Sequence, residues 1–242
     1  MGFLGLFRKQ RTSLSDSGVL NGLCDCHSHL LPGVDDGVAT IEQSLEVLAY
    51  LESQGVAEVW CTPHVMEDVP NETDALRARF AELQDAYKGP LKLNLAAEYM
   101  LDTEFENRLA KDDFLKFGED VVLVETSVNL PPYNLLNILE NMMAKGYRPM
   151  LAHPERYRYM DMPDYRHLRE MGVLMQLNLG SVVGYYGESA QDKAYRLLSH
   201  GWYNVLGSDC HRYSAVVGQF DRAVLPDEVV ADLAKVAKTS VF

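Results

Sequence analysis

Histidine and carboxylate side chains recur at a spacing of two residues in this 242-residue sequence. His27 and His29 form one such pair near the N-terminus, and Asp209 and His211 form another near the C-terminus. Residues two apart on a β-strand project from the same face of the sheet, so both members of a pair can point at one target. Imidazole and carboxylate groups without thiolate suit ions such as manganese, iron or zinc. The pairs therefore predict a metal site.

Further candidate ligands follow other predicted strands. They are His64, Glu98, Glu125 and His153. With the two pairs, they stand at or just after the ends of six predicted strands, which is the edge where α/β proteins build their active sites. His167 and His200 differ, because both fall on predicted helices. So many ligands exceed the needs of one ion, and we expect two or three ions.

Seven strand-like segments alternate with helix-like segments. The expected strands cover 23–29, 58–62, 92–97, 121–126, 150–153, 173–179 and 204–208, and the expected helices cover 40–54, 74–88, 103–111, 135–145, 164–171, 190–200 and 226–238. This alternation predicts a parallel sheet that closes into a barrel, with an open doubly wound sheet as the alternative. The period of two also places Cys24 and Cys26, like Cys210, on the side that faces the helices, as small buried residues.

We expect one domain over residues 23–242, preceded by a flexible leader over residues 1–22. The leader has apolar residues followed by basic ones: Phe3, Leu4, Leu6 and Phe7, then Arg8, Lys9 and Arg11. This composition suits weak contact with an anionic membrane or a partner, although a segment without contacts is the preferred interpretation. No apolar run approaches the roughly 18 residues of a membrane span. Four cysteines are too few for a disulfide framework, which favours a reducing cytoplasm.

The formal net charge of −13 argues against a nucleic acid as the main partner. Proteins that bind a nucleic-acid backbone gain affinity by neutralising its phosphates with lysine and arginine. Bound divalent cations would offset several of the negative charges locally. An acidic chain of this kind is therefore compatible with a cationic metal site.

Four motifs surround the candidate ligands. They read DCHSHLLPGVDDG over 25–37, TPH over 62–64, HPERY over 153–157 and SDCH over 208–211. In this combination and order they resemble the polymerase-and-histidinol-phosphatase family, called PHP, and within it the bacterial protein-tyrosine phosphatases of capsule and exopolysaccharide operons. The resemblance implies a distorted (β/α)7 barrel with its metal site at the C-terminal ends of the strands. It also implies three divalent ions, commonly manganese, with iron or zinc as alternatives.

Carried over to this sequence, the resemblance implies a ligand set for each ion. His27, His29, Glu98 and Asp209 would hold the first, Glu98 with Glu125 and His153 the second, and Asp36 with His64 and His211 the third. Spacing alone does not decide whether Asp35 or Asp36 is the metal ligand. The family pattern favours Asp36 and leaves Asp35 to cap the helix region that begins at Thr40.

The resemblance implies hydrolysis of phosphotyrosine in a protein by a metal-bound hydroxide. Three divalent ions and four carboxylates would leave a charge of about +2 to bind a phosphate dianion. Arg156 follows His153 and is placed to fork onto the phosphate, and Arg212 follows His211 as a weaker candidate. The implied partner is a capsule-regulating bacterial tyrosine kinase with a tyrosine-rich tail.

Other classes of function fit the sequence less well. A cysteine-based tyrosine phosphatase needs an arginine six residues after its cysteine, and those positions hold Leu30, Pro32, Glu67 and Val216. A small-molecule phosphatase of the histidinol-phosphate type is the main alternative within the same fold. A non-catalytic module that docks on a kinase is a third interpretation, and the complete set of ligands argues against it.

Overall fold

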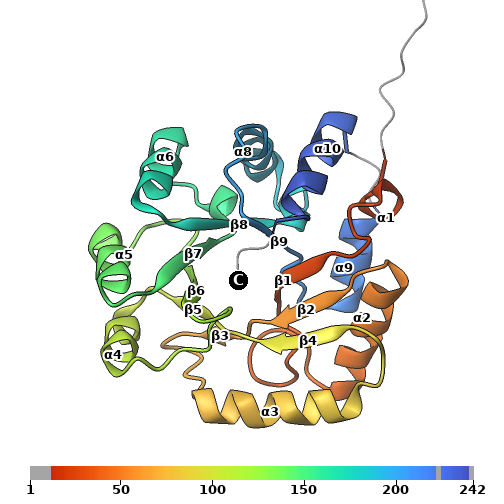
Figure 1. Cartoon of the computed structure of the whole chain (residues 1–242), viewed down its shortest axis with the longest axis horizontal. Helices are drawn as coiled ribbons and strands as arrows, with labels where there is room; N and C mark the ends of the chain where they lie inside the picture. The colour runs from red at the N-terminus through yellow and green to blue at the C-terminus, as the bar shows by residue number, and fades with distance from the viewer. Residues whose placement is uncertain (1–11, 222–224, 240–242) are drawn as a thin grey trace, which may run out of the picture.

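The computed structural model describes residues 12–221 and 225–239, and in them parallel strands curl around a centre with helices outside (Figure 1). The helices are α1 Leu14–Ser17, α2 Ile41–Ser53, α3 Thr73–Ala86, α4 Thr103–Lys111, α5 Leu135–Ala144, α6 Met162–Met171, α7 Leu179–Val182, α8 Glu188–Ser199, α9 Tyr213–Phe220 and α10 Asp227–Val236, with a 3₁₀ turn η1 at Pro154–Arg156. The strands are β1 Cys24–Ser28, β2 Glu58–Cys61, β3 His64–Val65, β4 Lys92–Leu95, β5 Glu98–Met100, β6 Val121–Glu125, β7 Arg148–Ala152, β8 Leu174–Asn178 and β9 Val205–Gly207. The predicted parallel α/β class is confirmed.

The strands form two parallel sheets that lie edge to edge. One has the order β1-β2-β4 and the other the order β3-β5-β6-β7-β8-β9. Beyond the named strands, a parallel bridge joins Ser28 to Cys210, and the amide of Asp209 donates to the carbonyl of His27 at 2.8 Å. The end of β1 is thereby tied to the residues that follow β9, and the sheet curls into at least a half-barrel.

Two of the predicted strands are each followed at once by a short strand that was not predicted. The strand expected over 58–62 is β2, and β3 follows it beyond Pro63. Proline has no N–H to donate to a ladder, so it interrupts a strand. The strand expected over 92–97 is β4, and β5 follows it over 98–100. Glu98 therefore lies within a strand, at its first residue, rather than after one.

The core has an inner and an outer part. The inner cluster, which includes Cys26, Trp60 and Met150, draws nearly all its residues from strands, whereas the outer cluster lies between strands and helices. The cysteine side chains were expected to face the helices. This is correct for Cys210, which packs in the outer cluster, and wrong for Cys24 and Cys26, which pack in the inner one. The pairing of β1 with β2 shifts in register between Asp25 and Ser28. A bulge of this kind re-aims side chains, so the period of two fails here.

Residues 12–22 are packed against the rest of the fold. Leu14 and Leu20 are buried, and Thr12 pairs with Leu225. The packed part of the chain thus begins earlier than the expected boundary at residue 23. The membrane contact expected of residues 3–11 lies outside the described residues. In the described ranges, none of the helices combines the length and apolar character that a membrane span needs.

Candidate metal centre

Glu98 is fully buried at the centre of a cluster of histidines. Its Oε2 lies 3.1 Å from the Nε2 of His27 and 3.1 Å from the Nδ1 of His64. Its Oε1 lies 3.0 Å from the Nε2 of His153. Glu98 begins β5, His64 begins β3 and His153 follows β7, so residues distant in sequence meet because their strands share one edge.

A second carboxylate, Asp209, closes the buried side of the cluster. Its Oδ1 lies 3.4 Å from the Nε2 of His29 and 3.5 Å from the Nε2 of His27. The two imidazole nitrogens of His27 and His29 are themselves 3.1 Å apart. Both rings are buried, and their nitrogens converge with Glu98 on one point.

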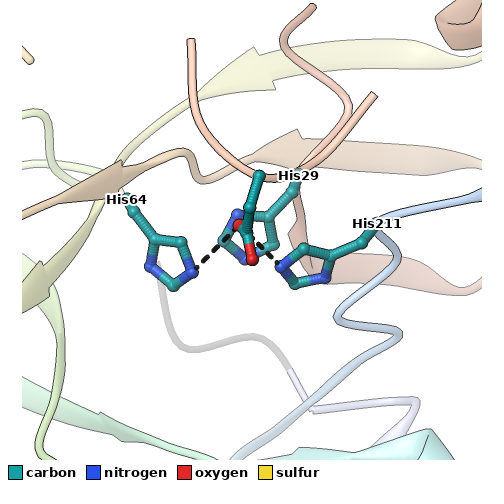
Figure 2. Close-up of side chains that lie close together, drawn as sticks. His29, His64 and His211 are labelled. Atoms are coloured by element: carbon teal, nitrogen blue, oxygen red, sulfur yellow. Dashed lines mark ion pairs between the residues drawn. The ribbon is translucent and has the colours of Figure 1, made fainter. Parts of the chain in front are cut away.

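The outer side of the cluster opens to solvent at Asp36. The Oδ1 of Asp36 lies 3.3 Å from the Nε2 of His211 and 3.6 Å from the Nε2 of His64, with the ring of His29 close by (Figure 2). The side chain of Asp36 is 70% exposed. With Glu125, whose Oε1 lies 3.1 Å from the Nδ1 of His64, the structure brings all the predicted metal ligands together.

Several polar atoms in the cluster suit a metal ion better than a hydrogen bond. The Nδ1 of His64 and the Oε1 of Glu125 are buried and 3.1 Å apart, yet neither has a hydrogen-bond partner in the described part of the chain. Buried polar atoms are nearly always hydrogen-bonded, so such exceptions point to a bound ion. The donors are imidazole and carboxylate, which fit manganese, iron or zinc.

Two residues hold the buried imidazoles from behind. The Oδ2 of Asp35 accepts from the Nδ1 of His29 at 2.8 Å and from the amide of His64 at 2.9 Å. The Oε1 of Gln176 lies 3.0 Å from the Nδ1 of His27. Groups that occupy the second nitrogen of a ligating histidine fix the ring's orientation. The expectation that Asp35 caps a helix is wrong, because the Thr40 side chain caps α2 and Asp35 turns toward the histidines.

Gln176 and Asn178 are not among the residues that the sequence predicted for the site. The Nδ2 of Asn178 donates to the Oδ2 of Asp209 at 2.8 Å. Both residues belong to β8, which carries no candidate ligand. They stand two apart in an otherwise apolar strand, so they share a face of the sheet. Two polar residues at this spacing were the feature of the sequence that could have predicted them as site residues.

Arg156 reaches the centre from η1. Its Nη1 donates to the Oδ2 of Asp209 at 2.9 Å, and its guanidinium lies 4.2 Å from the ring centroid of Tyr186. Tyr186 also donates to the Oδ2 of Asp209, at 3.2 Å. Arg212 is exposed and lines a cavity with His211 and Gly37. The two predicted arginines thus lie on either side of the centre, one anchored and one on the surface.

The backbone is strained at two candidate ligands. His153 has a φ of 34° and Asp209 a φ of 52°, in the left-handed region that residues with a side chain seldom adopt. His153 directly follows β7, and Asp209 lies two residues beyond the end of β9. Strain of this kind persists where the surrounding structure enforces it and is typical of functional sites.

Charge in the cluster is balanced between carboxylates and imidazoles. Burial acts to raise the pKa of Glu98, but the neighbouring His27 and His64 hold it well below its ordinary value. Burial likewise acts to lower the pKa of His64, but the Glu98 and Glu125 carboxylates raise it to about 10. Without an ion the imidazole of His64 therefore holds a proton at neutral pH. A divalent ion would take the place of that proton.

A parallel α/β fold with histidines and carboxylates gathered in one buried cluster defines a class of protein with side chains able to bind metal. The chain belongs to the family described as capsular polysaccharide synthesis, CpsB/CapC, whose sequence model matches residues 23–224. The family resemblance inferred from the motifs is thereby confirmed.

Two similar proteins are both named tyrosine-protein phosphatases. The tyrosine-protein phosphatase YwqE of Bacillus subtilis (strain 168) is 30% identical over 196 residues, which are 78% of this chain and 77% of that protein. The tyrosine-protein phosphatase CpsB of Streptococcus pneumoniae is 27% identical over 203 residues, covering 78% and 83%.

Solved structures agree with these matches. The chain resembles a solved structure from a study of YwqE of B. subtilis and CpsB of S. pneumoniae, which are described there as unique metal-dependent tyrosine phosphatases. The TM-score is 0.75 and the identity 26%, and the match covers 91% of this chain and 96% of that one. The lactonase Lmo2620 of Listeria monocytogenes, with a TM-score of 0.51 and 12% identity, shares the fold alone.

Proposed function

We propose that this chain is a metal-dependent protein-tyrosine phosphatase, which hydrolyses the phosphate ester of tyrosine in a protein. The observation that carries the proposal is the convergence of histidine and carboxylate side chains at one edge of a fold shared with such phosphatases. The histidinol-phosphate alternative is not favoured, because the similar relatives are named tyrosine-protein phosphatases.

The centre is proposed to hold three divalent ions, most suitably manganese. Three overlapping groups of side chains have ligand atoms close enough for one ion each: His29, Asp36, His64 and His211; His27, His29 and Glu98; and His64, Glu98 and Glu125. Asp209 and His153 lie against the second and third groups through Glu98 and its histidines. When bound, such ions activate a water and neutralise the phosphoryl oxygens.

Arg156 is proposed to bind the phosphoryl group while it holds Asp209 in place. A guanidinium has five N–H donors in a planar fork, and the contact with Asp209 uses one arm of it. The side chain remains 25% exposed. Arg212, on the exposed side next to His211, is the second candidate for this contact.

The fold is proposed to be a distorted (β/α)7 barrel of the PHP type. If β2 with β3, and β4 with β5, each count as one interrupted strand, seven strands follow one another around the centre in chain order. The bridge between Ser28 and Cys210 joins the last of these to the first. The candidate ligands then lie at the C-terminal ends of the strands.

The proposed substrate is phosphotyrosine on a tyrosine kinase that regulates capsule or exopolysaccharide synthesis, and the proposed location is the cytoplasm. The family description concerns capsular polysaccharide synthesis, which supports that setting. Four cysteines are too few for a disulfide framework, which supports a reducing compartment.

The proposal is tested by measuring hydrolysis of a phosphotyrosine peptide and of histidinol phosphate by the full chain, after chelation and again after manganese is restored. We expect fast turnover of the peptide that disappears with the chelator and returns with manganese. A preference for histidinol phosphate would overturn the substrate assignment. Peptide turnover that survives complete removal of metal would overturn the metal-dependent mechanism.

A further inference from the structure

An apolar groove lies between the β6–α5 loop with the start of α5 and the segment that leads from η1 into α6. Its volume is about 740 Å³, and its lining includes Pro132, Tyr133, Leu136, Tyr159, Met160 and His167. Tyr133 is fully exposed, and Leu136 is 42% exposed. Large apolar side chains left uncovered beside one another mark a surface that binds something.

The groove adjoins the candidate metal centre. Tyr159, in its wall, is hydrogen-bonded through its hydroxyl to the side chain of Thr126, the residue that follows Glu125. The ring of Tyr159 also stacks on that of Tyr157, with centroids 5.7 Å apart, and Tyr157 meets the ring of His153 at 5.9 Å. One layer of side chains therefore separates the groove from two candidate ligands.

The two walls of the groove are also held together as one unit. The amide of Arg158 donates to the carbonyl of Val128 at 2.8 Å, which ties the segment after η1 to the loop after β6. The Nζ of Lys193 on α8 donates to the carbonyls of Tyr157 and Met160, at 2.6 and 2.7 Å. A binding surface on so constrained a loop is formed in advance, which lowers the entropy lost on binding.

We propose that this groove binds an apolar side chain that flanks the phosphotyrosine in a substrate polypeptide. The inference rests on the proposed function, because a phosphotyrosine that enters the metal centre leaves its main chain outside, along the rim. Each residue of an extended chain advances by roughly 3.3 Å, so the first few residues on one side of the phosphotyrosine can reach the groove. Its apolar walls then select leucine-like or aromatic side chains over polar ones.

The test compares two phosphotyrosine peptides of equal length and charge, hydrolysed by the full chain with manganese. One carries leucine at the positions near the phosphotyrosine, and the other carries serine there. We expect kcat/KM to be about tenfold higher for the leucine peptide, mostly through KM, from burial of one such side chain. The Leu136→Asn variant is expected to bring the ratio of the two kcat/KM values close to one.

Leu130→Asn is the matched control, since Leu130 is an exposed leucine of the same loop that does not line the groove. It should keep the wild-type ratio, and thermal melting of both variants checks that they fold. Tyr133→Ser is a second groove variant, at a fully exposed position, and should also lower the ratio.

Three results would overturn the inference. Equal kcat/KM for the two peptides with the wild-type chain would show that the groove makes no contact with flanking residues. A ratio that Leu136→Asn and Tyr133→Ser leave unchanged, together with loss of a dimer in sedimentation, would show instead that the groove binds a second copy of the chain. If neither phosphopeptide is hydrolysed, the proposed function itself fails, and that outcome is distinct from the other two.

Discussion

Glu98 joins the parts of the candidate centre, because its two carboxylate oxygens reach the imidazoles of His27, His64 and His153. Around it, some residues are proposed metal ligands, and others hold those ligands in position. Asp35 is the clearest of the second kind, since one oxygen accepts from His29 and its side chain is wholly shielded from solvent. The hydrogen bonds to His29 and His64 outweigh burial and lower the pKa of Asp35 to about 2.

Asp35→Asn is therefore expected to weaken metal binding about 10- to 100-fold. The amide has one oxygen acceptor in place of two charged oxygens, so it cannot hold the His29 ring and the backbone of residues 37 and 64 equally well. A titration of the metal-free variant with manganese measures this loss.

Asp85→Asn, an exposed aspartate on α3, is the control for this substitution and should bind manganese like the wild type. Unchanged affinity in Asp35→Asn would show that Asp35 has no part in holding the ligand.

Which residues meet at the centre could be predicted from sequence, because residue type and position after a strand both point to the same edge. The roles of Asp35 and Gln176 could not be predicted in this way. Each depends on the direction in which a side chain turns, and spacing along the chain does not determine that direction. Asp36 was chosen over Asp35 from the family pattern alone.

At the scale of elements, β1 and β9 position the first histidine pair. The register shift between Asp25 and Ser28 turns His27 inward, and Gly207 on β9 leaves room for it. A Cβ added at Gly207 would lie 2.5 Å from the Cβ of His27 and closer still to the side-chain amide nitrogen, Nε2, of Gln176. Such a distance cannot be kept without movement of β1 or of its histidine.

Gly207→Ala is thus expected to lower the free energy of unfolding by roughly 1–3 kcal/mol and to weaken manganese binding. Denaturant unfolding and metal titration measure the two effects. Gly218→Ala is the matched control, because a Cβ at Gly218 on α9 meets no atom within 4 Å. It should raise stability by about 0.5–1 kcal/mol, since glycine is unfavourable inside a helix. A neutral Gly207→Ala would contradict the close packing of β9 on His27.

The long elements were predictable to within a few residues, because each has a clear apolar period and a start or stop residue. Helix α4 occupies the predicted range of 103–111. The interruption of the second strand at Pro63 and the bulge in β1 were missed, since both are local departures from a period that the sequence otherwise keeps. Helix α9 was missed, because no element was predicted between the last strand at 204–208 and the last helix at 226–238.

At the scale of the whole molecule, a chain with a net charge of −13 gathers imidazoles and carboxylates in one buried cluster. Without ions, protonated imidazoles balance the carboxylates there. Burial opposes the charge on His29 and His27, but the surrounding carboxylates raise the pKa of both above the ordinary value. The Glu98 and Glu125 carboxylates raise the pKa of His64 to about 10.

A raised histidine pKa in the folded state stabilises the metal-free protein below the unfolded pKa of about 6.5, and this stabilisation is lost as the pH rises toward the folded value. We therefore expect the melting temperature of the metal-free protein to fall between about pH 7 and pH 10. The manganese-loaded protein, in which ions replace the protons, should show a smaller fall. Melting curves of both forms across this range test the expectation, and parallel curves would contradict it.

The central claim is that the gathered histidines and carboxylates hold the ions on which activity depends. It is tested most directly by anomalous diffraction from crystals grown with manganese, measured near the manganese absorption edge. We expect three peaks bounded by the proposed ligands, with Glu98 beside two of them, and loss of the peaks beside it in Glu98→Gln. Peaks elsewhere on the molecule, or an active crystalline enzyme without a peak in this cluster, would contradict it.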